Sequence, residues 1–197
     1  ELMSEGKHIY VLCSHFHRDH FNRQILKWRW EQPYRRYTYI LSKDILQHGR
    51  AEANEADVWM ENGDEWCDEN IYVRATGSND YGVSWIVKVG GKTIFHAGDL
   101  NDWVWDEETE DYNRQMTLDY REQIGLLSAK LASREVDTAF VVLDPRQEKD
   151  YDRGICFFLE NLSAKQVYPM HYWEDPAVID TFLKDHPEHQ GKIRRTE

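Results

Sequence analysis

Four side chains that can bind a metal ion lie within six residues near the start of the chain: His15, His17, Asp19 and His20. In extended backbone, His15 and His17 project to the same side, so both imidazoles can bind one ion. The turn that follows can direct Asp19 and His20 toward a second ion. Neutral imidazoles and carboxylates suit a borderline divalent ion such as zinc. The alternative is a histidine-rich surface turn without a metal.

Two distant residues are candidate partners of this cluster. Asp99 comes just after a predicted apolar strand and a glycine, in Ile94–Asp99, and His171 comes just after the short predicted strand Gln166–Tyr168. Taken alone, each is more typical of an ordinary turn or of a structural histidine. Beside the histidine cluster we interpret both as metal ligands, with Asp99 well placed to bridge two ions.

The elements that position these residues alternate along the chain. A strand is predicted over residues 9–13, directly before the cluster, because a short continuous apolar run fits a buried strand. Further strands are predicted at 37–41, 58–60, 71–75, 83–89, 92–96, 136–143 and 166–168, and helices at 22–31, 43–48, 113–132, 155–162 and 177–185. This order indicates an α/β or mixed sandwich with helices packed outside sheets. No linker or repeat divides it, so a single domain over residues 1–197 is expected.

Composition narrows the classes of partner. The net charge is −12, from 24 basic and 36 acidic residues, without a long basic run, so nucleic acid is not an expected partner. No apolar run approaches the length of a membrane span, and residues 1–5 are unlike a signal peptide. The three cysteines Cys13, Cys67 and Cys156 form no CxxC pair, which favours a reducing compartment and a cytoplasmic protein. A small-molecule substrate is the expected partner, and oligomeric state is left open.

The HxHxDH run, the later Gly-Asp and the final histidine together resemble the metallo-β-lactamase superfamily. The phrases Phe95–Asp99 and Tyr168–His171 resemble its predicted metal-dependent hydrolases, the branch that includes ascorbate-lactonase-like proteins. The resemblance runs from about residue 8 to residue 185 and implies an αββα sandwich with two metals at one edge of the sheets. It assigns His15 and His17 to the first ion, Asp19, His20 and His171 to the second, and Asp99 to both.

The chain departs from that family in one ligand. The family usually supplies a further histidine from a turn that here corresponds to residues 77–84, where Ser78 stands in its place. Ser78 or Asp80 is a possible replacement ligand, and water is another. The first site is then expected to bind more weakly, or to prefer manganese or iron(II) over zinc. One occupied site instead of two is also compatible with the sequence.

The family normally begins with strands that precede the first motif by several tens of residues, whereas this sequence reaches its motif at residue 15. We therefore expect a sandwich that lacks its first strands, which are missing, replaced or outside this sequence. An uncovered sheet edge would be a liability, so an incomplete N-terminus is the interpretation we favour.

The resemblance implies a hydrolase in which a metal-bound hydroxide attacks a small ester, lactone or phosphodiester. Asp19 would orient the attacking water and accept its proton. His96 is either a hydrogen-bond partner near Asp99 or a packed strand histidine. Arg146 either holds an anionic substrate group or forms a surface salt bridge. Three tryptophans in loops after the motifs either wall a substrate pocket or cover the core: Trp103, Trp105 and Trp173.

Residue types distinguish this interpretation from other branches of the superfamily and from a non-catalytic domain. Diiron flavoproteins of the superfamily typically have a glutamate at the position of His17, so the histidine favours hydrolysis over redox chemistry. Asp99 occupies the place of the cysteine ligand that one β-lactamase branch uses. The alternative from another class is a non-catalytic, metal-stabilised binding or regulatory domain, which the missing histidine keeps open.

Overall fold

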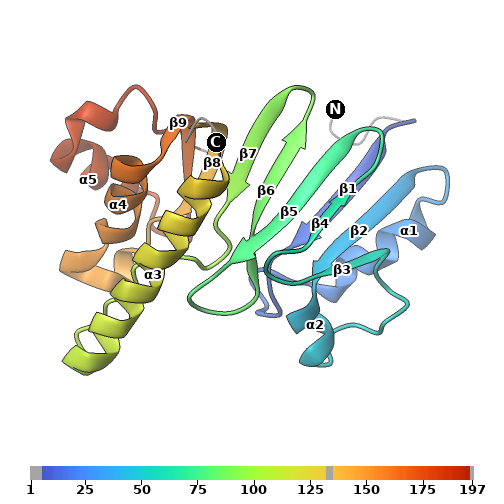
Figure 1. The fold of residues 1–197 in the computed structure, drawn as a ribbon, viewed down its shortest axis with the longest axis horizontal. Helices are drawn as coiled ribbons and strands as arrows, with labels where there is room; N and C mark the ends of the chain where they lie inside the picture. Colours follow the sequence, from blue (N-terminus) through green and yellow to red (C-terminus); the bar gives the residue numbers. More distant parts are fainter. Residues whose placement is uncertain (1–5, 132–134, 196–197) are drawn as a thin grey trace.

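Two β-sheets lie face to face at the centre of the molecule, with helices on both outer sides (Figure 1). The computed structural model describes residues 6–131 and 135–195. The smaller sheet is parallel and contains β1 (His8–Cys13), β2 (Arg36–Ser42) and β3 (Val58–Met60) in that order. Outside it lie η1 (Arg23–Lys27), α1 (Trp28–Glu31) and α2 (Lys43–Gln47).

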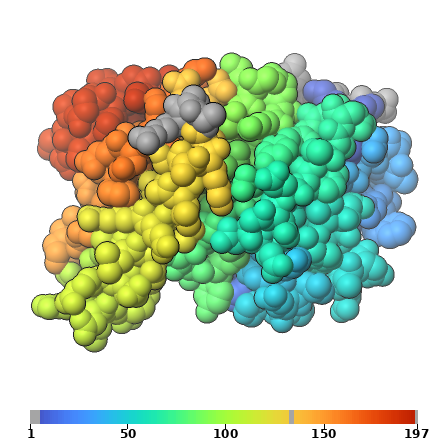
Figure 2. All heavy atoms as spheres, viewed as in Figure 1, coloured from blue at the N-terminus to red at the C-terminus, as the bar shows by residue number. Residues whose placement is uncertain are grey.

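The larger sheet has six strands in sequence order. They are β4 (Glu65–Cys67), β5 (Ile71–Gly77), β6 (Val83–Val89), β7 (Lys92–His96), β8 (Glu135–Val142) and β9 (Ser163–Met170). β4 to β7 are antiparallel neighbours, whereas β7, β8 and β9 are parallel. Its outer face carries α3 (Glu110–Lys130), α4 (Arg153–Asn161) and α5 (Ala177–Asp185). Figure 2 shows α3 running across the surface over this sheet.

Alternation along the strands separates the core into layers. In β2, Tyr39 and Leu41 pack with the helices outside the small sheet, while Ile40 packs between the two sheets with Val73 and Trp85. A third cluster joins the large sheet to α3, α4 and α5. Each large apolar side chain buried in this way contributes roughly 1.5–3 kcal/mol. The resulting order of helix, sheet, sheet and helix confirms the expected αββα sandwich.

The local predictions differ from the structure in a few places. The helix expected over residues 22–31 is instead η1 followed by the single turn of α1. The Asn22 side chain accepts a hydrogen bond from Gln24 N, and Ile25 N donates to Asn22 O. Such i to i+2 and i to i+3 bonds favour a tight 3₁₀ turn over an α-helix.

Other boundaries shift for similar local reasons. Helix α3 begins at Glu110, before the predicted residue 113, because Thr109 caps it by accepting from Tyr112 N. The predicted end of that helix, residue 132, lies outside the described residues. Strand β4 was not predicted, and β9 is longer than residues 166–168. Within the described part of the chain, none of the helices is both long and apolar enough to traverse a lipid bilayer.

Candidate metal centre

Parallel strands bring several acidic and imidazole side chains to one edge of the large sheet. Asp99, Asp144 and His171 follow β7, β8 and β9, and the carboxyl ends of parallel neighbours lie at the same edge. Because β6 is antiparallel to β7, the loop that precedes β6 lies at this edge too. That loop carries Asp80.

The histidine cluster reaches the same place from the other sheet. The turn after β1 is tied to the start of β6 by a hydrogen bond from Val83 N to Ser14 O of 3.0 Å. Gly82 lies against this junction in the left-handed region, with φ of 66°. A Cβ on Gly82 would lie 2.0 Å from Ser14 O and 2.6 Å from His15 Cβ. The absence of a side chain at residue 82 therefore lets the two sheets meet at the site.

Replacing Gly82 with alanine is expected to lower the free energy of unfolding by about 3 kcal/mol or more, because backbone strain adds to a collision with backbone. Urea unfolding followed by circular dichroism measures this free energy. Gly49→Ala is the matched control, because Gly49 has nearly the same φ, 63°, with open space around it. The control should lose only about 1–2 kcal/mol, the left-handed strain alone. Equal losses in the two variants would contradict the importance of the close contact.

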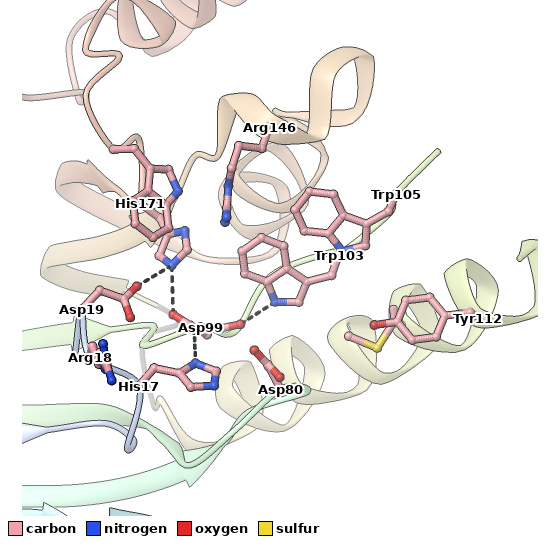
Figure 3. A pocket seen from close by; sticks show the side chains of 12 residues that line it. His17, Arg18, Asp19, Asp80, Asp99, Trp103, Trp105, Tyr112, Arg146 and His171 are labelled. Atoms are coloured by element: carbon pink, nitrogen blue, oxygen red, sulfur yellow. Dashed lines mark hydrogen bonds and ion pairs between the residues drawn. The ribbon is translucent and has the colours of Figure 1, made fainter. Parts of the chain in front are cut away.

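Asp99 lies among four histidines, of which Figure 3 shows His17 and His171. His15 Nε2 is 3.0 Å from Asp99 Oδ2, and His20 Nε2 is 2.8 Å from Asp99 Oδ1. His171 Nε2 is 3.4 Å and His17 Nδ1 is 3.8 Å from the same carboxylate. Burial opposes ionisation of Asp99, but its close interactions with His15, His171 and His20 outweigh burial and hold its pKa far below its ordinary value.

This site contains three groups of candidate ligands. Within each group, the ligand nitrogen and oxygen atoms lie within 4.8 Å of one another. The groups are His17 with Asp80 and Asp99, His15 with His20 and Asp99, and Asp19 with His20 and His171. Asp99 belongs to two of the groups and is buried, whereas Asp19 keeps 38% of its side chain exposed. All six ligands predicted from the sequence therefore lie together, with Asp99 between the others.

Two buried atoms test whether this site fits a cation. Asp99 Oδ1 and His171 Nε2 make no hydrogen bond of acceptable geometry, although His20 Nε2 lies 2.8 Å from Asp99 Oδ1. A buried polar atom without a partner costs about 1–3 kcal/mol. Close nitrogen and oxygen atoms that do not hydrogen-bond are the arrangement expected of two ligands of one cation. The imidazole and carboxylate donors thus fit a divalent metal of the zinc, manganese or iron(II) type.

The two proposed replacements for the absent histidine lie in different surroundings. Asp80 lines the cavity beside His17 and Asp99, and burial and the charge of Asp99 raise its pKa. Ser78 Oγ accepts a hydrogen bond from Asp80 N within the turn, and Ser78 is not among the residues lining the cavity. The geometry therefore favours Asp80 over Ser78 as the further ligand.

Asp144 is a site residue that the sequence analysis missed. Its fully buried carboxylate lies 2.9 Å from His171 Nδ1, which leaves His171 Nε2 directed at Asp99 and Asp19. Burial lowers the pKa of His171, but Asp144 and Asp99 outweigh it and raise the pKa to about 9. Carboxylates behind metal-binding histidines commonly fix the ring in this way. An acidic residue directly after the apolar run 136–143 was the available signal.

The backbone near His171 is unusual. His171 and Trp173 have φ of 71° and 52°, in the left-handed region that non-glycine residues rarely adopt. Residues held in such conformations cluster at functional sites. Here the bend follows the end of β9 and directs His171 back toward Asp99.

A cavity of about 450 Å³ opens over the candidate ligands and is lined by Arg146 and all three predicted tryptophans. The Arg146 guanidinium lies 4.5 Å from the Trp173 ring centre and 5.7 Å from that of Trp105, and it is hydrogen-bonded to Asp144. Trp103 is buried and donates from Nε1 to Asp99 O at 2.8 Å. Arg146 is thus both paired with a buried carboxylate and half-exposed to the cavity.

His96 acts on the turn before Asp99, because its Nδ1 accepts a hydrogen bond from Gly98 N at 3.1 Å. Gly98 has φ of 58°, and a Cβ there would lie 2.8 Å from Val83 O. Neutral His96 therefore holds the backbone turn and does not hydrogen-bond to the Asp99 carboxylate. Burial, with the charge of His20, lowers the pKa of His96 to about 4.

This shift predicts a pH-dependent stability of the metal-free protein. Below pH 6.5 the unfolded chain protonates His96 while the folded chain does not, so stability should fall as the pH decreases from about 6.5 to about 4. A shift from 6.5 to about 4 corresponds to a His96 contribution of at most roughly 3 kcal/mol. Thermal melts at several pH values should show a smaller dependence in His96→Asn. An unchanged pH dependence in that variant would contradict the assignment.

Comparisons with known proteins agree with the fold. No family model and no curated relative matches the chain. Its structure is similar to that of CmlA, a diiron β-hydroxylase from Streptomyces venezuelae, with a TM-score of 0.60 and 13% identity over 99% of this chain and 44% of CmlA. It is also similar to the metallo-β-lactamase fold protein YhfI from Bacillus subtilis (TM-score 0.58, 12% identity, 95% of this chain and 75% of YhfI).

A third similar structure is Zn²⁺-bound PqqB from Methylobacterium extorquens, with a TM-score of 0.54 and 13% identity over 94% of this chain and 70% of PqqB. The chain therefore has the metallo-β-lactamase fold. It spans less than half the length of CmlA. At these identities, the fold alone is shared.

Proposed function

We propose that this protein is a divalent-metal-dependent hydrolase that acts on a small anionic ester, lactone or phosphodiester. The observation that carries the proposal is the grouping of four histidines and two further aspartates around Asp99, beside one open cavity. The comparisons support the metal dependence only by analogy, since one similar structure contains zinc and another is described as diiron.

The residues present define which groups would hold the metal. His17, Asp80 and Asp99 would hold one ion together with His15, whose Nε2 lies 3.1 Å from His17 Nδ1. Asp19, His20 and His171 would hold another together with Asp99. When bound, divalent ions supply Lewis acidity and bring the pKa of a water molecule toward neutrality.

Asp19 is the best-placed base in the cavity. Its Oδ2 lies 3.5 Å from His20 Nε2 and 3.6 Å from His171 Nε2, and its partial exposure leaves the other side of the carboxylate open to a water molecule. A carboxylate in this position can orient that water and accept its proton. Asp144 holds the Nδ1 side of His171, which keeps His171 Nε2 fixed beside Asp19.

Arg146 supports an anionic substrate. Its guanidinium is held by Asp144 and by two indole faces, so little side-chain freedom is lost when it binds an anion. Trp105 and Trp173 add apolar walls beside it. The acidic ligands deeper in the cavity would repel an anion in the absence of this arginine and the metals.

The test is hydrolysis of a panel of lactones, carboxyl esters and phosphodiesters, each in charged and uncharged forms, by protein of measured metal content. The proposal expects hydrolysis of at least one charged compound, its loss on chelation and its return with zinc, manganese or iron(II). Metal binding without hydrolysis of any compound would instead favour the non-catalytic binding domain. Branch membership among ascorbate-lactonase-like proteins is supported if a lactone is the preferred substrate.

Arg146→Met is expected to raise KM for the charged substrate by about 10- to 100-fold while metal content stays unchanged, because hydrogen bonds to a charged group are worth about 1.5–3 kcal/mol. KM for the uncharged analogue should change little. Arg121→Met is the control, because Arg121 also lies over an aromatic ring, that of Phe157, but does not line this cavity. An equal rise for both substrates would argue against recognition of the anion.

A further inference from the structure

A second group of metal-binding side chains lies away from the candidate centre. Asp152, Cys156 and His186 place a carboxylate oxygen, a sulfur and an imidazole nitrogen within 4.8 Å of one another, and all three residues are partly buried. Asp152 and Cys156 belong to the start of α4, and His186 follows α5. None of these elements contributes a ligand to the candidate centre.

Helix geometry explains why two of the residues share a face. Asp152 is the N-cap of α4 and Cys156 lies one turn later, so the two side chains project to the same side. N-cap aspartates usually accept a hydrogen bond from the first turn, but the Asp152 side chain makes none. It lies 2.7 Å from His186 Nε2 instead.

His186 is held in place independently of this contact. Its backbone N–H donates to Phe182 O at 2.8 Å, and its ring lies 4.8 Å from that of Phe182, which is fully buried. The core therefore positions the imidazole against α4. A site built on a helix and a buried anchor is more rigid than one carried on a free loop.

The distances fit tetrahedral coordination. Zinc bonds of about 2.3 Å to sulfur and about 2.0–2.1 Å to nitrogen separate the two ligands by about 3.6 Å at a tetrahedral angle. Cys156 Sγ lies 3.6 Å from His186 Nε2. The contact between Asp152 and His186 is shorter than the about 3.3 Å expected for two such ligands, so these side chains would move apart by about 0.6 Å on binding.

The charges around the thiol also favour a cation. Burial, followed by the carboxylates Asp152, Glu160 and Glu188, raises the pKa of Cys156 to about 12. Glu188 Oε1 lies 3.7 Å from His186 Nδ1, the nitrogen on the far side of the ring. A carboxylate behind a coordinating imidazole is a common feature of zinc sites.

From this geometry we infer that Asp152, Cys156 and His186 form a second divalent-cation site, selective for a thiolate-binding ion such as zinc, with water in the remaining position. Binding releases the Cys156 proton, and the ion replaces the direct contact between Asp152 and His186. The site fastens the segment after α5 to the start of α4. It is separate from the proposed hydrolytic centre and does not depend on that function.

Cobalt(II) is the probe, because a cobalt–thiolate bond gives a charge-transfer absorption that histidine and carboxylate ligands do not give. The groups around Asp99 contain no cysteine, so in the described structure this absorption reports on the second site. Metal-free protein titrated with cobalt should develop the absorption. Cys156→Ser should abolish it and lower bound cobalt by about one equivalent per chain.

Two controls make the result specific. Cys67→Ser removes an exposed thiol and should leave the absorption unchanged. Asp99→Asn disturbs the candidate centre and should also leave it unchanged. His186→Asn should weaken the cobalt–thiolate absorption. This variant provides a second test if Cys156→Ser does not fold. If wild-type protein binds cobalt without thiolate absorption, or Cys156→Ser keeps both the absorption and the stoichiometry, the inference is overturned and the cluster is an ion pair only.

Discussion

Asp99→Asn is expected to remove the bound divalent metal, by about one equivalent or more, and to reduce hydrolysis by at least about 10³-fold. The carboxylate lies among four histidines and belongs to two of the ligand groups, so its negative charge serves both proposed ions. Asparagine keeps the shape but offers one neutral oxygen. Elemental analysis and steady-state kinetics on the same preparations measure both effects.

The matched control for this prediction is Asp106→Asn. Asp106 lies in the same connection to α3 but is exposed and pairs with Lys149 at the surface. Its loss should change neither metal content nor rate. Circular dichroism should show that the Asp99 variant retains the parent secondary structure. Full metal content in Asp99→Asn would exclude Asp99 as a bridging ligand.

Asp19→Asn is expected to separate chemistry from metal binding, with kcat lowered by about 10²- to 10⁴-fold at nearly unchanged metal content. Its ion would still have His20, His171 and Asp99, all of them more buried than Asp19. The amide can still face the cavity but cannot accept a proton at neutral pH. Pre-steady-state or steady-state rates at saturating substrate, paired with elemental analysis, measure the separation.

The shape of the pH–rate profile is the sharper readout for Asp19. A general base gives a rate that rises with pH as the base loses its proton, and this limb should disappear in Asp19→Asn. A parallel drop in metal content and rate would show that Asp19 acts only as a ligand. The neighbouring Arg18→Gln serves as control, because Arg18 lines the cavity but has no atom in the ligand groups.

Apolar runs, turn residues and helical spacing predicted most of the fold. The apolar runs at 83–89 and 92–96 and the helix at 177–185 have the bounds that the structure shows. The turn at Gly90-Gly91 sets the facing ends of the two strands, and apolar residues at helical spacing mark the helix. The segment after residue 22 was predicted less well, because a hydrogen bond from Gln24 N to the Asn22 side chain favours a 3₁₀ turn there.

The ligand types were also visible in the sequence, and the prediction of the individual ligands stays a prediction. The close spacing of His15, His17, Asp19 and His20 is a local property that needs no tertiary structure to be noticed. The roles of Asp144 and Asp80 depend on what lies across from them. Asp144 matters because β8 places it beside β9, and Asp80 because the loop before β6 lies at the end of β7.

By itself, the sequence indicated an α/β or mixed sandwich, which the family resemblance narrowed to αββα, and it showed the set of imidazoles and carboxylates at strand ends, because apolar patterns and residue types are properties of short segments. Only the tertiary structure decided which of them face one another. It placed Asp99 among the histidines, put Asp144 behind His171 and joined α4 to His186. The physical reason is that these contacts connect residues 27 to 84 positions apart, and strand order and helix packing alone bring such residues within a few ångströms.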